Sequence, residues 1–329
     1  MDPLSETAIA ELGRLCPDGV ERGVDLSAVS QWRIGGRADL VLRPASTAEV
    51  SALTSWFAAR GIRPVVIGLT SNLLFDDAGL RVPCIQIGAR MAQISLEGAR
   101  VRAQAGIWVP GLARRLMQAG LGGAEHICGI PGTLGGLICM NGGSQRKGIG
   151  SNLLEVESVT SDGVVHTRPA QEGGFGYRQS VYQANGEIIT AATLHLPTRP
   201  RAEIRAEMRA ILADRRRKFP RKEPNCGSVF VSDPALYAQH GPPGAIIESL
   251  GLKGRRIGDA LVSPRHANFI VNAGAARSVD MLALIQEISQ RSMTELGAPL
   301  RAEVRYVASD GTTCPATQAH KDALAETAP

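Results

Sequence analysis

Aromatic residues are scarce in this chain, at 4% of 329 residues. Proteins that bind nucleic acid combine a strongly basic face with interleaved aromatics, whereas the net charge here is only +5. No uncharged apolar stretch is long enough to span a bilayer. These shortages predict that neither nucleic acid nor a membrane is a partner of this protein.

The cysteines and the N-terminus argue against further classes. The six cysteines are widely spaced and form no C-x-x-C pair, which argues against a metal site and against a disulfide framework. The first residues, MDPLSETAIAEL, lack the basic start and the apolar core of a signal peptide. We therefore expect a cytoplasmic protein that binds no metal.

Glycine, by contrast, is abundant, with 37 residues. The glycines gather at 68–79, 129–150 and 173–176, and each cluster follows an apolar run. Backbone that approaches a ligand closely uses glycine in this way, and so does a tight turn, so both interpretations stay open. Because the Rossmann G-x-G-x-x-G and P-loop patterns are absent, a nucleotide cofactor would have to be held differently.

The first part of the chain predicts a β-α-β unit. Residues 38–46 alternate like a strand, and Ser46 with Glu49 forms a capping box that starts a helix. Gly61 ends this helix, and residues 63–68 form a short buried strand. A glycine cluster follows the carboxyl end of that strand, where α/β sheets tend to place ligands.

Two prolines, Pro197 and Pro200, mark the predicted boundary between two domains. A chain of this length accommodates two domains with a core in each. On the N-terminal side we predict strands at 84–88, 94–98, 100–106 and 188–196, a helix at 109–120 and a hairpin at 154–167. On the C-terminal side we predict a helix that ends at Pro220, strands at 228–232, 266–274 and 301–308, a short helix at 245–251 and a long helix from Ser278.

The densest basic run spans residues 215–222 and holds six cations. It fits a solvated helix end, where cations suit the helix dipole. It also fits a contact with an anionic small-molecule substrate, and its closeness to Ser228 favours that interpretation.

Two glycine-rich segments are candidates for ligand contacts. GLTSNLL, residues 68–74, offers successive backbone N–H groups after a buried strand, which suits a pyrophosphate or a plain turn. CGIPGTLGGLICMNGGS, residues 128–144, is rigid at Pro131 and short of large side chains in its glycine-rich turn. It would lie flat against an aromatic ring system, pack closely against a sheet, or do both.

Three side chains from distant segments indicate a function only when they are considered together. Ser228 lies in EPNCGSVF, Arg178 in GFGYRQS and Glu303 in AEVR. Taken singly, they are a turn serine, a solvated arginine and a surface strand carboxylate, and no local spacing unites them.

The order of the motifs resembles one family. Seven segments occur in the order and spacing of the UDP-N-acetylenolpyruvoylglucosamine reductase (MurB) family, between Trp32 and Arg305: WRIGGRADLVLRP, GLTSNLL, GIPGTLGGLICMNGG, GFGYRQS, CGSVF, GLKGRRIGDALVSPRHANFIVN and AEVR. Seven ordered matches are more specific than any single glycine pattern. The compact spacing between CGSVF and GLKG resembles the shorter type II branch, which lacks an inserted substrate-covering loop.

The resemblance implies an α+β fold, with a PCMH-type (vanillyl-alcohol-oxidase-like) FAD-binding domain followed by a smaller α/β substrate domain. Such FAD domains hold the pyrophosphate with loop amides, which explains the missing Rossmann pattern. The implied limits are an N-terminal segment at 1–30, the FAD-binding domain at 31–198, the C-terminal substrate-binding domain at 199–308 and a flexible tail at 309–329.

The resemblance also implies an FAD-dependent oxidoreductase of peptidoglycan precursor synthesis. NADPH, the co-substrate, would reduce FAD. The hydride would then pass to the enolpyruvyl group of UDP-N-acetylglucosamine enolpyruvate, giving UDP-N-acetylmuramate. The expected partner is therefore a small nucleotide sugar, and we expect a monomer.

Three residues match the family's catalytic positions. Arg178 matches the arginine that binds the substrate carboxylate, and Ser228 matches the proton donor. Glu303 matches a glutamate that helps to stabilise the anion when protonated or bridged by water, and burial would raise its pKa. The matching cofactor positions are Gly68, Thr70, Ser71, Asn72, Leu73, Gly129, Ile130, Pro131, Gly132, Thr133, Gly136 and Asn141. The matching substrate positions are Tyr177, Arg217, Lys218 and Asn268.

Three positions depart from the family pattern. Thr70 stands where the family usually has glycine, Val231 where a basic residue often follows the Phe, and Ala245 where many members have lysine. The last two keep open a paralogue that acts on another nucleotide sugar. An FAD-linked oxidase, which would use oxygen, would not need Ser228 and Glu303 together. Retention of Arg178, Ser228 and Glu303 argues against a non-catalytic flavin- or nucleotide-binding protein.

Overall fold

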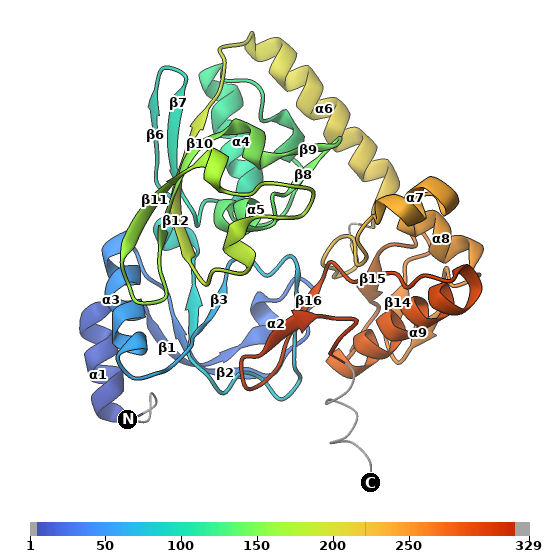
Figure 1. The fold of residues 1–329 in the computed structure, drawn as a ribbon, viewed down its shortest axis with the longest axis horizontal. Helices are drawn as coiled ribbons and strands as arrows, with labels where there is room; N and C mark the ends of the chain where they lie inside the picture. Colours follow the sequence, from blue (N-terminus) through green and yellow to red (C-terminus); the bar gives the residue numbers. More distant parts are fainter. Residues whose placement is uncertain (1–4, 221, 320–329) are drawn as a thin grey trace. The chain divides into compact units, whose positions relative to one another are not determined.

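The computed structural model describes residues 5–220 and 222–319. The chain divides into two compact units, both of them discontinuous in sequence. Unit 1 takes in the described part of Met1–Arg22 together with Leu40–Leu69 and Pro83–Arg215. Unit 2 takes in Gly23–Asp39, Thr70–Val82 and the described part of Arg216–Pro329. Figure 1 shows the elements of each unit.

The first sheet belongs mainly to unit 1, although parts of two of its strands fall in unit 2, and it is built on the predicted β-α-β unit. Its strand order is β1-β2-β5-β3, and β2 and β3 both run parallel to β5, which lies between them. Helix α3 begins after Ser46, whose Oγ accepts the Glu49 N–H at 3.1 Å. The Glu49 carboxylate accepts the N–H of Ala45, one residue before the cap, at 2.9 Å. The bounds are β1 Val20–Asp25, β2 Arg37–Leu42, α3 Thr47–Ala58, β3 Val65–Ile67 and β5 Cys84–Gln86.

The second sheet of unit 1 has five antiparallel strands in the order β11-β10-β12-β7-β6. Its middle strand β12 is buried at every residue but the last, so both faces of this strand are covered. Helix α3 packs against β10 and β12, and α5 packs against β7 and β12 (Figure 1). The bounds are β6 Ile94–Glu97, β7 Arg100–Gln104, α5 Leu134–Cys139, β10 Leu153–Val159, β11 Val165–Pro169 and β12 Ile188–His195.

Two further helices complete the scaffold of unit 1. Helix α1 (Glu6–Leu15) packs against α3. Helix α4 (Val109–Ala119) ends as predicted at Gly120, whose φ of 73° is the left-handed conformation that a C-cap glycine supplies. The short elements are η1 Ala89–Met91, η2 Glu125–Ile127, β8 Gly143–Ser144, β9 Lys147–Gly148, η3 Ile149–Asn152, η4 Ala170–Glu172 and η5 Val181–Gln183. Helix α6 (Arg201–Lys218) begins in unit 1 and ends in unit 2.

Unit 2 contains two three-stranded sheets. In the order β17-β16-β4, strand β16 runs parallel to β4 and antiparallel to β17. The order β13-β14-β15 is antiparallel throughout, and helix α9 packs against β13 and β14. The bounds are α2 Leu26–Val29, β4 Leu73–Phe75, α7 Pro234–His240, α8 Pro243–Ser249, β13 Arg256–Ile257, β14 Ala260–Val262, β15 Ile270–Asn272, α9 Ser278–Leu296, β16 Arg305–Val307 and β17 Thr313–Pro315.

The buried side chain of Trp32 anchors residues 23–39 to the core of unit 2. Its side chain is fully buried, and its indole Nε1 donates to the Ile270 carbonyl at 2.8 Å. The Asn272 side chain returns a hydrogen bond of 3.0 Å to the Trp32 carbonyl. Trp32 is therefore part of the same core as β15, although the two lie more than 230 positions apart in sequence.

Three predicted strands of the C-terminal part are wrong or too long. Residues 228–232 form no strand, and Phe230 makes a single isolated bridge to Ala302. The predicted strand 266–274 shrinks to β15, and the predicted strand 301–308 shrinks to β16. Part of the predicted flexible tail is ordered, because β17 pairs with β16; residues 320–329 of that tail lie outside the described residues.

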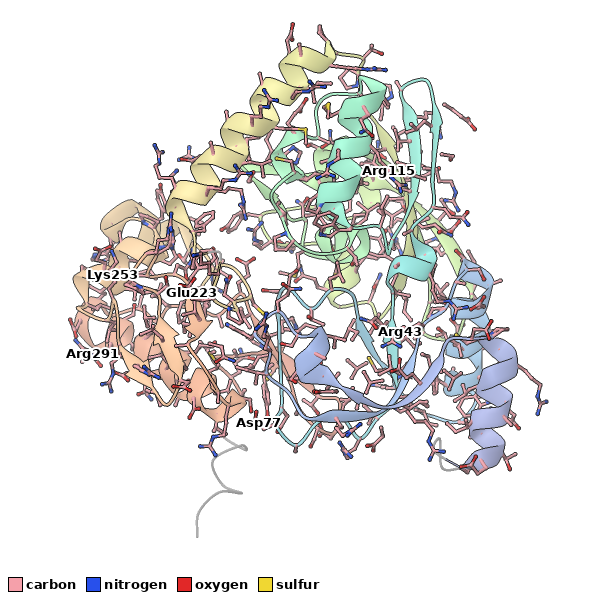
Figure 2. The ribbon with its side chains drawn as sticks, turned by 180° about the vertical axis from the view of Figure 1, so that it is seen from behind. Arg43, Asp77, Arg115, Glu223, Lys253 and Arg291 are labelled. Atoms are coloured by element: carbon pink, nitrogen blue, oxygen red, sulfur yellow. The ribbon has the colours of Figure 1, made fainter. Side chains whose placement is uncertain are left out.

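Asp77, labelled in Figure 2, binds the N-terminus of α9 from a distant part of the chain. Its carboxylate accepts the Ser278 N–H at 2.8 and 3.0 Å and the Ser278 hydroxyl at 2.8 Å. The first N–H groups of a helix have no partner inside the helix, and a negative charge suits that end of its dipole. Asp77 therefore stabilises both the start of α9 and the position of the 70–82 segment.

Replacing Asp77 by Ala should lower the free energy of unfolding by about 1 kcal/mol, the usual cost of losing a helix cap. Asp77→Asn, which keeps an acceptor oxygen without the charge, should lose less. Chemical denaturation of the three proteins measures both values. Equal stability of wild type and Asp77→Ala would contradict this account of the α9 terminus.

Candidate active site

Arg178 occupies the tip of a tight turn in unit 1. Gly176 and Gln179 exchange backbone hydrogen bonds of 3.1 and 3.2 Å, with Tyr177 and Arg178 between them. Arg178 has a φ of 55°, in the left-handed region that the third residue of a type II turn requires and that glycine usually fills. A left-handed conformation costs a side-chain-bearing residue about 1–3 kcal/mol, and such residues cluster at functional sites.

The neighbouring ring belongs to the same turn. Tyr177 is largely exposed, and the Arg178 guanidinium carbon lies 5.5 Å from the centre of the Tyr177 ring. A cation at this distance from an aromatic face is attracted by the ring. The two predicted residues of this motif are therefore presented together.

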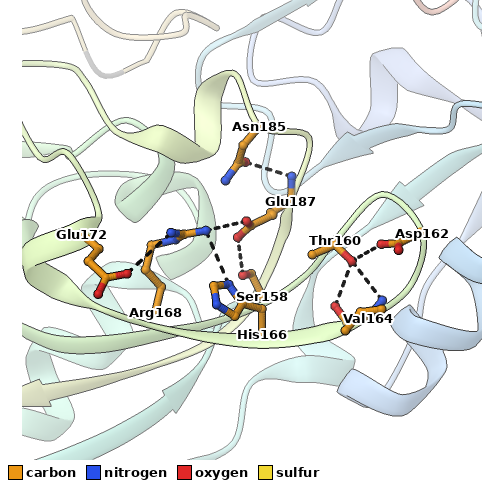
Figure 3. Close-up of polar contacts among 9 residues, drawn as sticks. All are labelled: Ser158, Thr160, Asp162, Val164, His166, Arg168, Glu172, Asn185 and Glu187. Atoms are coloured by element: carbon orange, nitrogen blue, oxygen red, sulfur yellow. Dashed lines mark hydrogen bonds and ion pairs between the residues drawn. The ribbon is translucent and has the colours of Figure 1, made fainter.

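An ion-pair network joins the two ends of the segment that carries this turn (Figure 3). Arg168, in β11, contacts Glu172 at 3.8 Å and Glu187 at 2.8 Å. Ser158 also donates to Glu187, at 2.6 Å. Burial would raise the pKa of the Glu187 carboxyl, yet the hydrogen bonds from Ser158 and Arg168 hold it below its usual value. Because Glu172 precedes the turn and Glu187 follows it, Arg168 fastens both ends of the intervening chain.

Two predicted cofactor segments meet in unit 1. Gly68 follows β3, and a Cβ placed on it would lie 2.4 Å from the Thr133 Oγ1. Thr133 caps α5 by accepting the Gly136 N–H at 3.4 Å. Pro131, in the loop before α5, and Gly136, in the first turn of α5, are exposed. Backbone and small side chains are therefore presented where a planar ring system would need close approach, so these residues fit a flavin.

The same glycine-rich segment also packs closely against the protein. The Gly135 N–H donates to the Ala105 carbonyl at 2.8 Å, and a Cβ on Gly135 would lie 3.0 Å from the Ala105 Cβ. A Cβ on Gly129 would lie 2.5 Å from the Arg215 Cδ. Close packing against a sheet, one of the two open interpretations, is confirmed at Gly135, which lies beside the end of β7, whereas Gly129 packs against α6. The predicted contacts of Gly129, Ile130 and Gly132 with a cofactor stay a prediction.

The side-chain amide of Asn141 forms hydrogen bonds with the backbone of unit 1. Its Nδ2 donates to the Gly176 carbonyl at 2.7 Å, and its Oδ1 accepts the Gly150 N–H at 2.9 Å. Asn141 therefore joins the chain just after α5 to the turn that carries Arg178. Its predicted contact with the cofactor stays a prediction.

In unit 2, the predicted pyrophosphate turn begins at Thr70. This residue has a φ of 55°, so the threonine adopts the left-handed conformation that the family's usual glycine supplies. The Thr70 hydroxyl donates to the Val29 carbonyl at 2.8 Å. The Leu73 N–H closes the turn by donating to the Thr70 carbonyl at 3.2 Å, with Ser71 and Asn72 between them.

Ser228 lies on an irregular, half-buried stretch of backbone in unit 2. Gly227, just before it, has a φ of 81°. Just after it, the Val229 N–H donates to the Asn268 carbonyl at 2.9 Å and the Val229 carbonyl accepts the Glu303 N–H at 2.7 Å. The backbones of Ser228 and Glu303, 75 positions apart in sequence, are therefore neighbours.

Glu303 lies at a bend just before β16 rather than inside the predicted strand. The Asn72 Nδ2 donates to the Glu303 carbonyl at 3.0 Å, and the Arg305 N–H donates to the Asn72 carbonyl at 3.1 Å. Cys226, whose pKa burial raises, lies with its Sγ 3.4 Å from the Leu73 carbonyl. The pyrophosphate turn, the Ser228 segment and Glu303 thus meet within one unit.

Asn268 pairs with the backbone of Phe230 as a strand neighbour would. Its Oδ1 accepts the Phe230 N–H at 2.9 Å, and its Nδ2 donates to the Phe230 carbonyl at 3.0 Å. Asn268 is 5% exposed. Sequence reasoning predicted a substrate contact for this residue, whereas the geometry favours a role in holding the Ser228 segment.

A pocket of about 600 Å³ lies in unit 2 close to the end of α6. Three cations line it, namely Arg216, Lys222 and Arg265. The Arg265 Nη2 also donates to the carbonyls of Arg216 and Arg217, at 2.6 and 3.0 Å, and so binds the carboxyl end of the helix. The other lining residues are Pro220, Glu223, Leu261, Ser263, Pro264 and Val271.

The predicted diphosphate contacts, Arg217 and Lys218, are the exposed last residues of α6. The residues that line the pocket include neither of them. Arg216 and Lys222 belong to the same basic run, and its Arg221 lies outside the described residues. Arg265, by contrast, was missed, although it stands in the SPRHANFIVN motif.

In residues 5–220 and 222–319, no helix is long and apolar enough to cross a membrane. Within the same ranges, no group of three or more His, Cys, Asp or Glu side chains could hold a metal ion.

Two protein-family models match the chain. The model of an FAD binding domain matches residues 38–168, and the model of the UDP-N-acetylenolpyruvoylglucosamine reductase C-terminal domain matches residues 219–307. This protein is therefore an FAD-dependent oxidoreductase, and the predicted order of an FAD-binding domain followed by the C-terminal domain of this reductase family is confirmed.

Individual relatives agree with the family models. UDP-N-acetylenolpyruvoylglucosamine reductase 1 of Corynebacterium glutamicum is 43% identical over 293 residues, covering 89% of this chain and 88% of the relative. The enzyme of Heliobacterium modesticaldum is 37% identical, covering 87% and 90%. The crystal structure of the Thermus caldophilus reductase has a TM-score of 0.74 at 33% identity, covering 87% and 98%. The chain belongs to the UDP-N-acetylenolpyruvoylglucosamine reductase family.

Replacing Asn268 by Ala should lower the free energy of unfolding by about 2 kcal/mol, because two backbone groups of Phe230 lose a partner worth about 1 kcal/mol each. Asn185→Ala is the control: Asn185 is exposed and accepts one backbone N–H, at 3.0 Å, so it should lose clearly less. Urea denaturation compares the variants. A similar, small loss in both would show that Asn268 does not hold the Phe230 backbone.

Proposed function

We propose that this protein reduces UDP-N-acetylglucosamine enolpyruvate to UDP-N-acetylmuramate, with NADPH as reductant and FAD as bound cofactor. This reaction serves peptidoglycan precursor synthesis, and through it cell-wall growth and cell division. The observation that carries the proposal is the 2.7 Å hydrogen bond from the Glu303 N–H to the Val229 carbonyl. It brings the expected glutamate beside the segment of the expected proton donor, Ser228.

We assign the FAD contacts to backbone and small side chains of the predicted cofactor segments. They are Gly68, the stretch from Gly129 to Gly136, in which Pro131 and Gly136 are exposed, and the turn from Thr70 to Leu73. Consecutive loop N–H groups suit a pyrophosphate, and small residues suit a flat ring. The chemistry that FAD supplies when bound is hydride transfer, from NADPH and then to the double bond of the substrate.

The chain's own residues then manage charge and protons. Hydride addition to an unsaturated acid pushes negative charge onto the substrate carboxylate. Arg178 would bind that carboxylate through the planar fork of its guanidinium, and stabilisation of developing charge is usually the largest contribution to catalysis. Ser228 would donate a proton to the α-carbon, and Glu303, protonated or through a water, would help to stabilise the anion.

The basic pocket of unit 2 offers a place for the substrate's diphosphate. Arg216, Lys222 and Arg265 supply positive charge around it, although Val231 and Ala245 stand where relatives carry basic residues. Arg217 and Lys218 would add positive charge at the adjoining end of α6. Glu223 also lines this pocket, so three cations face one carboxylate, and the net positive charge attracts an anionic ligand.

Location and assembly are also proposals. We propose a cytoplasmic site of action, because NADPH and nucleotide sugars are cytoplasmic metabolites. The monomeric state and the domain limits at 1–30, 31–198, 199–308 and 309–329 stay predictions.

Anaerobic reaction with NADPH tests the proposed function. The purified protein should be yellow with FAD, NADPH should bleach it, and UDP-N-acetylglucosamine enolpyruvate should restore the colour. Rapid return of colour with oxygen but not with this substrate would favour an FAD-linked oxidase. A protein that takes up no FAD would refute every flavin-based proposal.

Ser228→Ala should separate the two half-reactions. NADPH should still bleach the flavin at the wild-type rate, whereas recolouring by the enolpyruvyl substrate should slow by about 10²–10⁴-fold, the usual contribution of a positioned acid. Stopped-flow absorbance measures both rates. Ser232→Ala, four residues later, is the matched control and should leave both unchanged; equal losses in both half-reactions of Ser228→Ala would mean a structural role.

A further inference from the structure

Gln183 bonds directly to the strained residue of the Arg178 turn. Its Nε2 donates to the Arg178 carbonyl at 2.9 Å and to the Cys139 carbonyl at 3.0 Å. Gln183 ends η5, just after the turn, and Cys139 ends α5. One amide group therefore joins the carbonyl of Arg178 to the end of the glycine-rich segment.

Other side chains hold different atoms of the same loop. Asn141 bonds to the Gly176 carbonyl at 2.7 Å, and the Ser180 hydroxyl donates to the Cys139 carbonyl at 2.6 Å. These bonds fix the start and the end of the turn. Gln183 bonds to the peptide of Arg178 itself, whose orientation depends on the torsions of that residue.

The energies involved are of similar size. Holding Arg178 at a φ of 55° costs about 1–3 kcal/mol. A hydrogen bond typically contributes about 0.5–1.5 kcal/mol, a range that overlaps this cost. The bond from Gln183 is therefore large enough to decide whether Arg178 keeps the left-handed conformation or relaxes out of it.

We propose that Gln183 is a positioning residue, which holds Arg178 in the backbone conformation that presents its guanidinium to the substrate carboxylate. The inference rests on the proposed function of Arg178. A misplacement of about 1 Å at a reacting group costs about 10²-fold in rate. Loss of Gln183 should therefore affect the reaction with the carboxylate-bearing substrate and spare the reduction by NADPH.

Gln183→Met tests this, because methionine has a similar length and donates no hydrogen bond. Recolouring of the reduced flavin by the enolpyruvyl substrate should slow by about 10–100-fold, with a raised KM for that substrate. Bleaching by NADPH should stay within about twofold of wild type. Gln183→Lys, whose ammonium donates to two carbonyls, should restore most of the lost rate.

Gln179→Met is the matched control. It makes the same chemical change in the same turn, at a residue whose side chain is exposed. It should leave both half-reactions near wild type. A Gln179→Met variant as slow as Gln183→Met, or failure of Gln183→Lys to restore the rate, would overturn the inference.

A double-mutant cycle separates this inference from the proposed function. If Gln183 acts through Arg178, Arg178→Ala combined with Gln183→Met should be no slower than Arg178→Ala alone. Additive losses would overturn the positioning role. An Arg178→Ala variant that recolours normally would refute the role of Arg178, whereas a slow Arg178→Ala beside a normal Gln183→Met would refute the inference alone.

Gln183→Glu serves as a second variant should Gln183→Met fail to fold. It keeps the shape of glutamine, and its carboxylate accepts hydrogen bonds without donating any. It should slow the same half-reaction and spare bleaching by NADPH. Wild-type recolouring by a folded Gln183→Glu would overturn the inference.

Discussion

A backbone carbonyl outside regular secondary structure needs a donor, and side-chain amides supply it at four places in the proposed site segments. A buried peptide group without a partner costs as much as a lost hydrogen bond, so an irregular segment is stable only where something replaces the missing ladder. The pairs are Gln183 with the carbonyl of Arg178, Asn141 with Gly176, Asn268 with Phe230 and Asn72 with Glu303.

Irregular backbone can direct side chains in ways that a strand does not allow. Along a strand, side chains alternate between two faces at fixed spacing. Arg178 and Thr70 have left-handed φ values, and Gly227 beside Ser228 does too. Each departs from that alternation. An amide on a neighbouring segment stabilises the local conformation, so the functional side chain keeps its direction without a strand beneath it.

Sequence patterns predicted the parts of the fold that depend on local signals. Ser46 and Glu49 at the start of α3, and Gly120 at the end of α4, act on residues close by in sequence. A short stretch of sequence is therefore enough to predict these helix ends. The strand predicted at 228–232 failed because Phe230 finds its partner in the side chain of Asn268. The Asn268 side chain, 38 positions from Phe230 in sequence, takes the place of a neighbouring strand. The apolar periodicity of residues 228–232 does not indicate this.

The discontinuous units had no local signal either. Trp32 joins the core of unit 2 through a hydrogen bond to the Ile270 carbonyl, and β4 pairs in parallel with β16. Parallel pairing of strands so far apart in sequence depends on the whole fold, and single-residue propensities carry little information about it. Long-range pairing is therefore the part of the fold that the pattern of the sequence could not give.

The candidate site was predictable in a different way. Arg178, Ser228 and Glu303 were proposed from the order of seven motifs, and nothing local distinguished them. Gln183 was missed although it follows GFGYRQS by three residues. Its importance depends on the left-handed conformation of Arg178, and an arginine gives no sign of such a conformation in sequence.

The hydrogen bonds that hold the proposed catalytic residues are formed within each unit. In unit 1, Gln183 and Asn141 hold the Arg178 turn; in unit 2, Asn268 and Asn72 hold the segments of Ser228 and Glu303. Carboxylate binding and proton delivery are therefore positioned by separate sets of hydrogen bonds. Because the two sets share no donor or acceptor, weakening one set removes no hydrogen bond from the other.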